Sequence, residues 1–156
     1  MAMKKALLAV FAFAALAFAG LGSAQKFSVY TGYPFGIGGM YYLSENLRVD
    51  GTVMIVPGGF GVGGGVDMIL GKIPVVEQDP FPINFYYGVG GSAGFVSVLN
   101  VGVFGVGANV FGGLEYRFNE GLGIFSEFGV GPALGFYPSG MIFTLDYVGR
   151  FGLNFY

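Results

Sequence analysis

Three residue types are missing from this 156-residue chain, namely cysteine, histidine and tryptophan. Without cysteine the chain has no disulfide framework, no thiolate zinc site and no thiol nucleophile. Without histidine it has no serine–histidine catalytic pair, no imidazole base and no HExxH zinc site. Charge is scarce as well, because charged residues make up 10 % of the chain against about 25 % in ordinary soluble domains. We therefore expect no catalytic residue, no cofactor and no metal site, and the chain is not predicted to be an enzyme.

Hydrophobic residues and glycine dominate what is present. Hydrophobic residues make up 54 % of the chain, and 31 residues are glycine, where average usage is about 7 %. A disordered chain needs low hydrophobicity and high net charge, so this composition excludes one. The length favours one folded domain. The glycines are too numerous for an ordinary packed core and need an explanation.

Residues 1–24 have the form of a secretory signal peptide. Two lysines precede an uninterrupted apolar run, and the small residues Gly-Ser-Ala end the segment at positions 22–24. This arrangement is typical of an exported protein whose signal is removed. An uncleaved membrane anchor is the alternative, but the apolar run is at the short end for a membrane span. We predict cleavage before Gln25, which leaves a domain of residues 25–156.

The rest of the chain alternates between two kinds of residue. From Phe104 to Phe118 the even positions are apolar or glycine, while the odd positions are mostly glycine, polar or charged. Such alternation is typical of β-strands, and each strand is near or above the roughly 9–11 residues that a tilted strand needs to cross a bilayer. We predict eight strands, at residues 26–33, 35–43, 47–56, 60–70, 83–94, 101–118, 122–136 and 141–156.

Charged residues within the strands fall on the less apolar face of each strand. The apolar face could then meet lipid, where a lysine or arginine at the bilayer midplane costs roughly 2–4 kcal/mol. The sequence thus predicts an all-β fold, an eight-stranded antiparallel up-and-down transmembrane β-barrel. Lys26 shares the inward face with the residues that we predict to form a charge network in the lumen. That network is Arg48, Asp50, Asp67, Glu115, Arg117, Glu127, Asp146 and Arg150.

Three other architectures fit the pattern less well. The stretch 80–114 lacks charge and is long enough for a membrane helix, but its alternation and its glycines oppose that interpretation. A periplasmic β-sandwich needs a polar outer face, whereas the charge-free face here carries most of the phenylalanines. A glycine-rich fibre needs no ordered placement of charge.

The even number of strands places both termini on one side of the membrane, which we expect to be the periplasm. Five connecting charges would then lie in the three periplasmic turns, and the remaining connections are short and uncharged. The longest connection, residues 71–82, would also be periplasmic. The connecting charges are Glu45, Lys72, Glu77, Asp79 and Glu120.

The C-terminal third resembles a known family. Residues 113–118 and 123–127, joined by a short turn, are similar to a hairpin of small outer-membrane barrels of the OmpA-transmembrane-domain and OmpX type. The resemblance implies a bacterial outer-membrane location, with the lipid bilayer and the outer-membrane insertion machinery as partners. It also implies an insertion signal in the aromatic-ended final strand, although Tyr156 extends one residue past the usual terminal aromatic. The residues of that signal are Phe151, Leu153, Phe155 and Tyr156.

Two functions remain open at this stage. The first is a structural membrane component whose lumen is filled by charged residues, and the second is a narrow channel for small or apolar solutes, because inward glycines leave space. Residues 88–93 match a dinucleotide-binding pattern, but neither a helix nor an acidic residue follows at the required place. Basic clusters are also missing, which opposes nucleic-acid binding. We expect a monomer.

Overall fold

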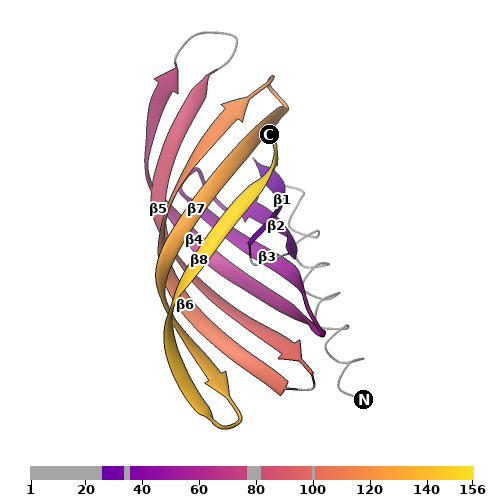
Figure 1. The fold of residues 1–156 in the computed structure, drawn as a ribbon. Coiled ribbons are helices and arrows are strands. Elements are labelled where there is room, and N and C mark those ends of the chain that lie inside the picture. Colours follow the sequence, from indigo (N-terminus) through magenta and orange to yellow (C-terminus); the bar gives the residue numbers. More distant parts are fainter. Residues whose placement is uncertain (1–25, 34–35, 77–81, 100) are drawn as a thin grey trace.

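The strands form a closed ring in the computed structural model, which describes residues 26–33, 36–76, 82–99 and 101–156 (Figure 1). Each strand pairs antiparallel with the next, and the last strand pairs with the first. This confirms the predicted all-β, eight-stranded, up-and-down barrel. The proposed signal peptide, residues 1–24, lies outside the described residues. The strands are β1 (Phe27–Tyr33), β2 (Gly36–Tyr42), β3 (Leu47–Val56), β4 (Gly59–Val76), β5 (Ile83–Val98), β6 (Val101–Arg117), β7 (Leu122–Tyr137) and β8 (Gly140–Phe155).

The barrel has one low wall and one tall wall. Strands β1 and β2 have 7 residues each and β3 has 10, whereas β4 to β8 have 16 to 18. We call the end where β1 begins and β8 finishes the proximal end, and the opposite end the distal end. Figure 1 shows the hairpin of β7 and β8 extending at the distal end, at the bottom of the view, well past β1. Within the described ranges, no helix is long and apolar enough to cross a membrane.

Residue alternation sorts the side chains as the sequence predicts. Arg48, Asp67 and Glu127 face inward and are buried, while large apolar side chains on the neighbouring positions face outward and are exposed. The facing of β2, which the sequence left ambiguous, follows from Met40, which is buried inside, and Ile37, which is exposed outside. The outer surface is therefore an apolar belt. Members of that belt include Val53, Val66, Val89, Val110, Phe128, Leu145 and Phe151.

A β-bulge in β4 lies where the sequence predicted a connection. The strand continues to Val76, so the predicted connection at 71–82 begins six residues too early. The register of β4 against β5 shifts between Ile69 and Gly71, which leaves Leu70 as an extra residue. An extra residue reverses the inward and outward alternation beyond it. Lys72, expected in a turn, therefore lies in a strand and faces the lumen.

Inward glycines make room for large side chains in the proximal part of the lumen. A Cβ atom at position 113 would lie 2.5 Å from Cζ of Tyr86, which no real side chain tolerates. A Cβ atom at position 152 would lie 2.8 Å from the ring of Phe125. In the distal part, by contrast, a Cβ at position 105 would meet only a carbonyl oxygen at 3.7 Å. The glycines thus admit aromatic rings at one end and border open space at the other.

Candidate functional site

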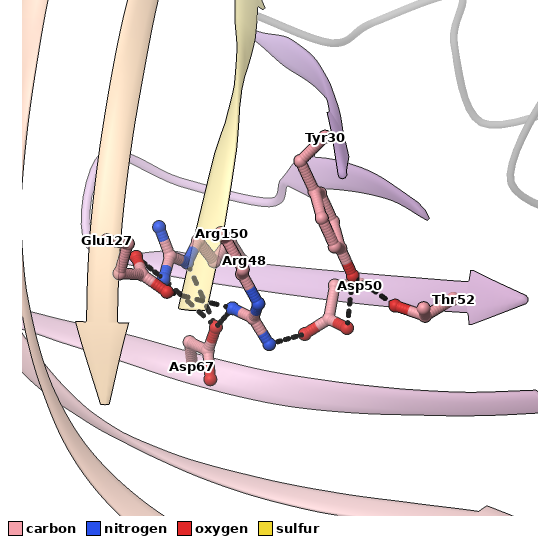
Figure 2. A network of polar contacts seen from close by, with 7 residues as sticks. All are labelled: Tyr30, Arg48, Asp50, Thr52, Asp67, Glu127 and Arg150. Carbon is pink, nitrogen blue, oxygen red and sulfur yellow. Dashed lines mark hydrogen bonds and ion pairs between the residues drawn. The ribbon is translucent and has the colours of Figure 1, made fainter. Parts of the chain in front are cut away.

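Five charged side chains meet across the middle of the lumen, and we call them the central cluster. They come from β3 and β4 on one side of the barrel and from β7 and β8 on the other. Each of the five is at most 9 % exposed. Figure 2 shows the two arginines lying among the carboxylates, with Glu127 on one side and Asp50 on the other. The cluster consists of Arg48, Asp50, Asp67, Glu127 and Arg150.

Both arginines bridge carboxylates from different strands. Nη1 of Arg150 donates to Oδ2 of Asp67 at 2.8 Å and to Oε1 of Glu127 at 3.0 Å. Its Nη2 donates to Oδ2 of Asp50 at 3.1 Å. Nε of Arg48 donates to Asp67 at 3.1 Å, and its Nη2 donates to Glu127. The planar guanidinium suits such multiple contacts, because it presents several donors in a fixed fork.

Aromatic and hydroxyl groups complete the surroundings of the central cluster. The hydroxyl of Tyr30 donates to Oδ1 of Asp50 at 3.1 Å and also contacts the hydroxyl of Thr52. The guanidinium carbon of Arg48 lies 4.7 Å from the ring centre of Phe111, within cation–π range. A buried charge is tolerated only when it is paired and hydrogen-bonded, and these contacts pair every charge of the cluster, although Nη1 of Arg48 has no hydrogen-bond partner in the described part of the chain. The cluster links opposite walls of the barrel at this level.

A second group of polar side chains, which we call the proximal cluster, surrounds Glu115 nearer the proximal end of the barrel. Nζ of Lys72 and Nδ2 of Asn154 each donate to this carboxylate at 2.7 Å. Lys26 and the hydroxyl of Tyr156 donate to it as well. The proximal cluster is therefore Lys26, Lys72, Glu115, Asn154 and Tyr156. Sequence reasoning placed Glu115 in one network with the central residues, whereas the structure gives it a separate set of partners.

Burial changes the pKa of Lys26 and of Tyr156, the two members of the proximal cluster that lie outside the strands. Burial lowers the pKa of Lys26, and the neighbouring Glu115 carboxylate opposes that change. Burial raises the pKa of Tyr156, and its hydrogen bond to Glu115 raises the pKa further. Nζ of Lys26 also lies 4.7 Å from the ring centre of Tyr156. The carboxylate of Glu115 thus stabilises a cation on one side and a neutral phenol on the other.

Among the described residues, Arg117 and Asp146 form no ion pair with either cluster, although Arg117 borders the proximal cluster. Arg117 donates to the backbone oxygens of Asn119 and Glu120, at 3.0 Å and 2.6 Å, and its guanidinium stacks over the ring of Tyr156. Asp146 is exposed, and no lysine or arginine nitrogen of the described residues lies within 4.0 Å of it. Arg117 ends β6, and Asp146 lies on the inward face of β8 in the part of that strand beyond its pairing with β1. There the inward direction leads to a rim or an open space rather than to an opposing wall.

A cavity of about 260 Å³ occupies the distal half of the lumen. Its lining is mostly glycine, alanine and valine from β4 to β8, and Asp146 also borders it. Tyr30, Asp50 and Arg150 line it where it meets the central cluster. Among the described residues no group of acidic side chains is arranged to hold a metal ion. The lumen is thus hollow in its distal half and crossed by ion pairs at its middle.

The residues of the predicted insertion signal divide between the two faces of the wall. Phe151, Leu153 and Phe155 face outward and are exposed. Phe155 stacks on Phe27 of the adjoining strand, with ring centres 6.3 Å apart. Tyr156, which follows the last strand, instead points into the proximal cluster.

In comparisons with known proteins no family model matches the chain, and no curated protein or solved structure matches it either. The function is therefore argued from the geometry of the barrel.

Proposed function

We propose that this protein is an integral barrel of a bacterial outer membrane, a structural membrane component whose lumen is blocked by charged residues. The observation that carries the proposal is the contrast between the two faces of one wall. The outer face is an apolar belt, while ion pairs such as Arg48–Glu127 cross the lumen and are fully buried. A water-exposed protein rarely shows so extensive an apolar surface. A transmembrane barrel requires it.

Several other features support the same proposal. The ring of strands is closed by the pairing of β1 with residues 149–155 of β8, and closed barrels meet the bilayer's demand that backbone polar groups be satisfied internally. The signal-like segment 1–24 supports export, and the outward Phe151, Leu153 and Phe155 support recognition by the outer-membrane insertion machinery. The resemblance to OmpA-type and OmpX-type barrels belongs to this proposal. We further propose that the protein is a monomer and has no catalytic activity.

A lysine placed on the outer belt tests membrane insertion directly. Val110 lies midway along β6 and faces outward, so Val110→Lys should cost roughly 2–4 kcal/mol of folding free energy in lipid vesicles. Leu43, exposed in the turn after β2, provides the matched control, and Leu43→Lys should cost less than about 1 kcal/mol. The measurement is urea unfolding of protein refolded into vesicles. Equal costs for the two variants, or a wild-type chain that stays out of the vesicles, would contradict the proposal.

A narrow channel is the second candidate, and the hollow distal half of the lumen favours it. Recordings of single molecules in planar bilayers separate the two functions. The blocked barrel predicts no steady ion current from the wild-type protein, and brief openings when the central cluster is broken in Arg48→Ala. Steady wild-type openings whose size changes in Glu127→Ala would replace the structural function with the channel.

A further inference from the structure

The distal half of the lumen has space that the protein's own side chains leave unfilled. The cavity there measures about 260 Å³, just below the range of about 300–1,000 Å³ typical of small-molecule pockets. Cβ atoms at positions 105 and 107 would make only ordinary contacts, of 3.4 Å or more. Larger inward residues would therefore fit at these positions without displacing backbone. At these two positions the backbone does not require glycine.

The cavity also has access from the side. The pairing of β1 with β8 ends at Tyr33 and Gly149, so residues 140–148 of β8 have no partner strand on that side in the part of the chain that the structure describes. Figure 1 shows this segment of the β7–β8 hairpin standing beyond the low wall. Outward residues along it are large and apolar, including Met141, Phe143 and Leu145. Apolar side chains therefore border the outer side of this opening, along which β8 also presents backbone groups that have no β1 partner.

The charges around the cavity are mainly negative. Asp146 borders it and has no cationic partner among the described residues. Asp50 and Arg150 border its inner end, where they belong to a cluster of three carboxylates and two guanidiniums. Both guanidiniums are already shared between carboxylates. An anionic ligand would meet uncompensated negative charge, whereas a cation would be attracted.

We propose that the distal cavity binds a small amphipathic cation, with its hydrocarbon part against the glycine-lined wall and its cationic group beside Asp146. The apolar lining and the side opening receive the hydrocarbon, and the unpaired carboxylate selects the charge. This inference goes beyond the proposed structural function. It needs only the fold, and it does not depend on the protein lying in an outer membrane.

Titration with n-hexylammonium tests the proposal, because this probe has a short apolar chain and one positive charge. Isotope-labelled protein in nonionic detergent is followed by the amide signals of the cavity glycines, such as Gly63, Gly105 and Gly107. We expect saturable shifts at these glycines. The anion n-hexanoate, which has the same chain length, should bind at least tenfold more weakly.

Three variants assign the binding to the cavity. Gly105→Leu should fill the hollow and abolish the saturable shifts, while Gly91→Leu, on the outward face of the neighbouring strand, should leave them unchanged. Asp146→Asn should weaken hexylammonium binding by about threefold, as expected for an exposed charge contact. It should leave hexanoate binding unchanged or slightly stronger.

Two results would overturn the proposal. One is equal binding of hexylammonium and hexanoate, and the other is a set of shifts that persists in Gly105→Leu, which would indicate partitioning into the detergent. Neither result bears on membrane insertion, which the Val110→Lys comparison measures separately. Failure of the cavity proposal and failure of the structural proposal are therefore distinguishable.

Discussion

The proximal and distal halves of the lumen are built from the same alternating strands, yet one is filled and the other is hollow. In the filled half, the low wall of β1 to β3 stands opposite the tall wall, so Arg48 reaches Glu127 across the barrel. In the hollow half, the tall wall extends beyond β1, and Asp146 finds no partner there among the described residues. Charge pairing therefore depends on an opposing wall as well as on an inward position.

The largest expected loss of stability comes from removing an ion-pair partner from the filled half. Arg48→Met should lower the free energy of unfolding by about 3–5 kcal/mol, because it leaves the buried carboxylates Asp67 and Glu127 with one cation fewer. Urea unfolding of refolded protein measures this loss. Arg117→Met is the control, since Arg117 lies at the rim, and it should cost less than about 1 kcal/mol. Similar losses of unfolding free energy for both substitutions would contradict the idea that an inward charge contributes more when it faces an opposite wall than when it lies at the rim.

A smaller difference in stability should separate glycines that contact a side chain in the filled half from glycines that border the hollow half. Gly113→Ala should destabilise the barrel by about 1–3 kcal/mol, because the new Cβ collides with Tyr86 and with a backbone oxygen of Ser126. Gly105→Ala faces the hollow and should be neutral or stabilising by up to about 1 kcal/mol, since it restricts the unfolded chain. The same unfolding assay checks both. A loss in Gly105→Ala as large as that in Gly113→Ala would mean that the distal half is as tightly packed as the proximal half.

Substitutions at the rim of the filled half should change the free energy of unfolding only slightly. The Lys72 side chain is 50 % exposed although it pairs with Glu115, so Lys72→Met should lower the free energy of unfolding by only about 0.2–1 kcal/mol. Lys72→Arg should retain most of the stability. A loss of several kcal/mol in Lys72→Met would show that removing a cation costs as much stability in the proximal cluster as in the central cluster.

The smallest effect appears only at alkaline pH. Because the pKa of Tyr156 is raised in the folded state, the unfolded chain loses this proton first, and stability falls as the pH rises above about 10. Tyr156→Phe lacks this contribution. The stability difference between the two proteins should be constant below about pH 9 and shrink above it, as measured by urea unfolding across pH. A constant difference up to pH 11 would contradict the shielded environment of this phenol.

Alternation in the sequence identified the inward face of the wall and so found the central cluster. It found Asp50, Asp67 and Arg150 because the period of two is unbroken where they lie, the bulge of β4 coming after Asp67. Alternation does not encode how far each strand extends past its neighbour. For that reason it could not separate Glu115 from the central residues, nor show that Asp146 faces open space.

Two members of the proximal cluster lay beyond such reasoning for local causes. Lys72 follows the bulge at Leu70, and a bulge leaves no clear mark in a sequence of apolar residues and glycine. Tyr156 falls on the inward face of the predicted strand 141–156, but alternation alone could not identify Glu115, 41 residues away in the sequence, as its partner. Asn154, by contrast, lies on the inward face of β8 and was available as a polar inward residue.

The bulge at Leu70 changes which positions of β4 face the lumen. Residues before it face inward at odd positions, and Lys72 and Pro74 after it face inward at even positions, until a second register shift between Pro74 and Val76. One inserted residue has thus exchanged the inward and outward positions between the two shifts. In a barrel wall, inserting one residue can therefore turn an outward lysine inward, where it pairs with a buried carboxylate as Lys72 does with Glu115. Deleting a residue at the same place would turn the lysine outward again.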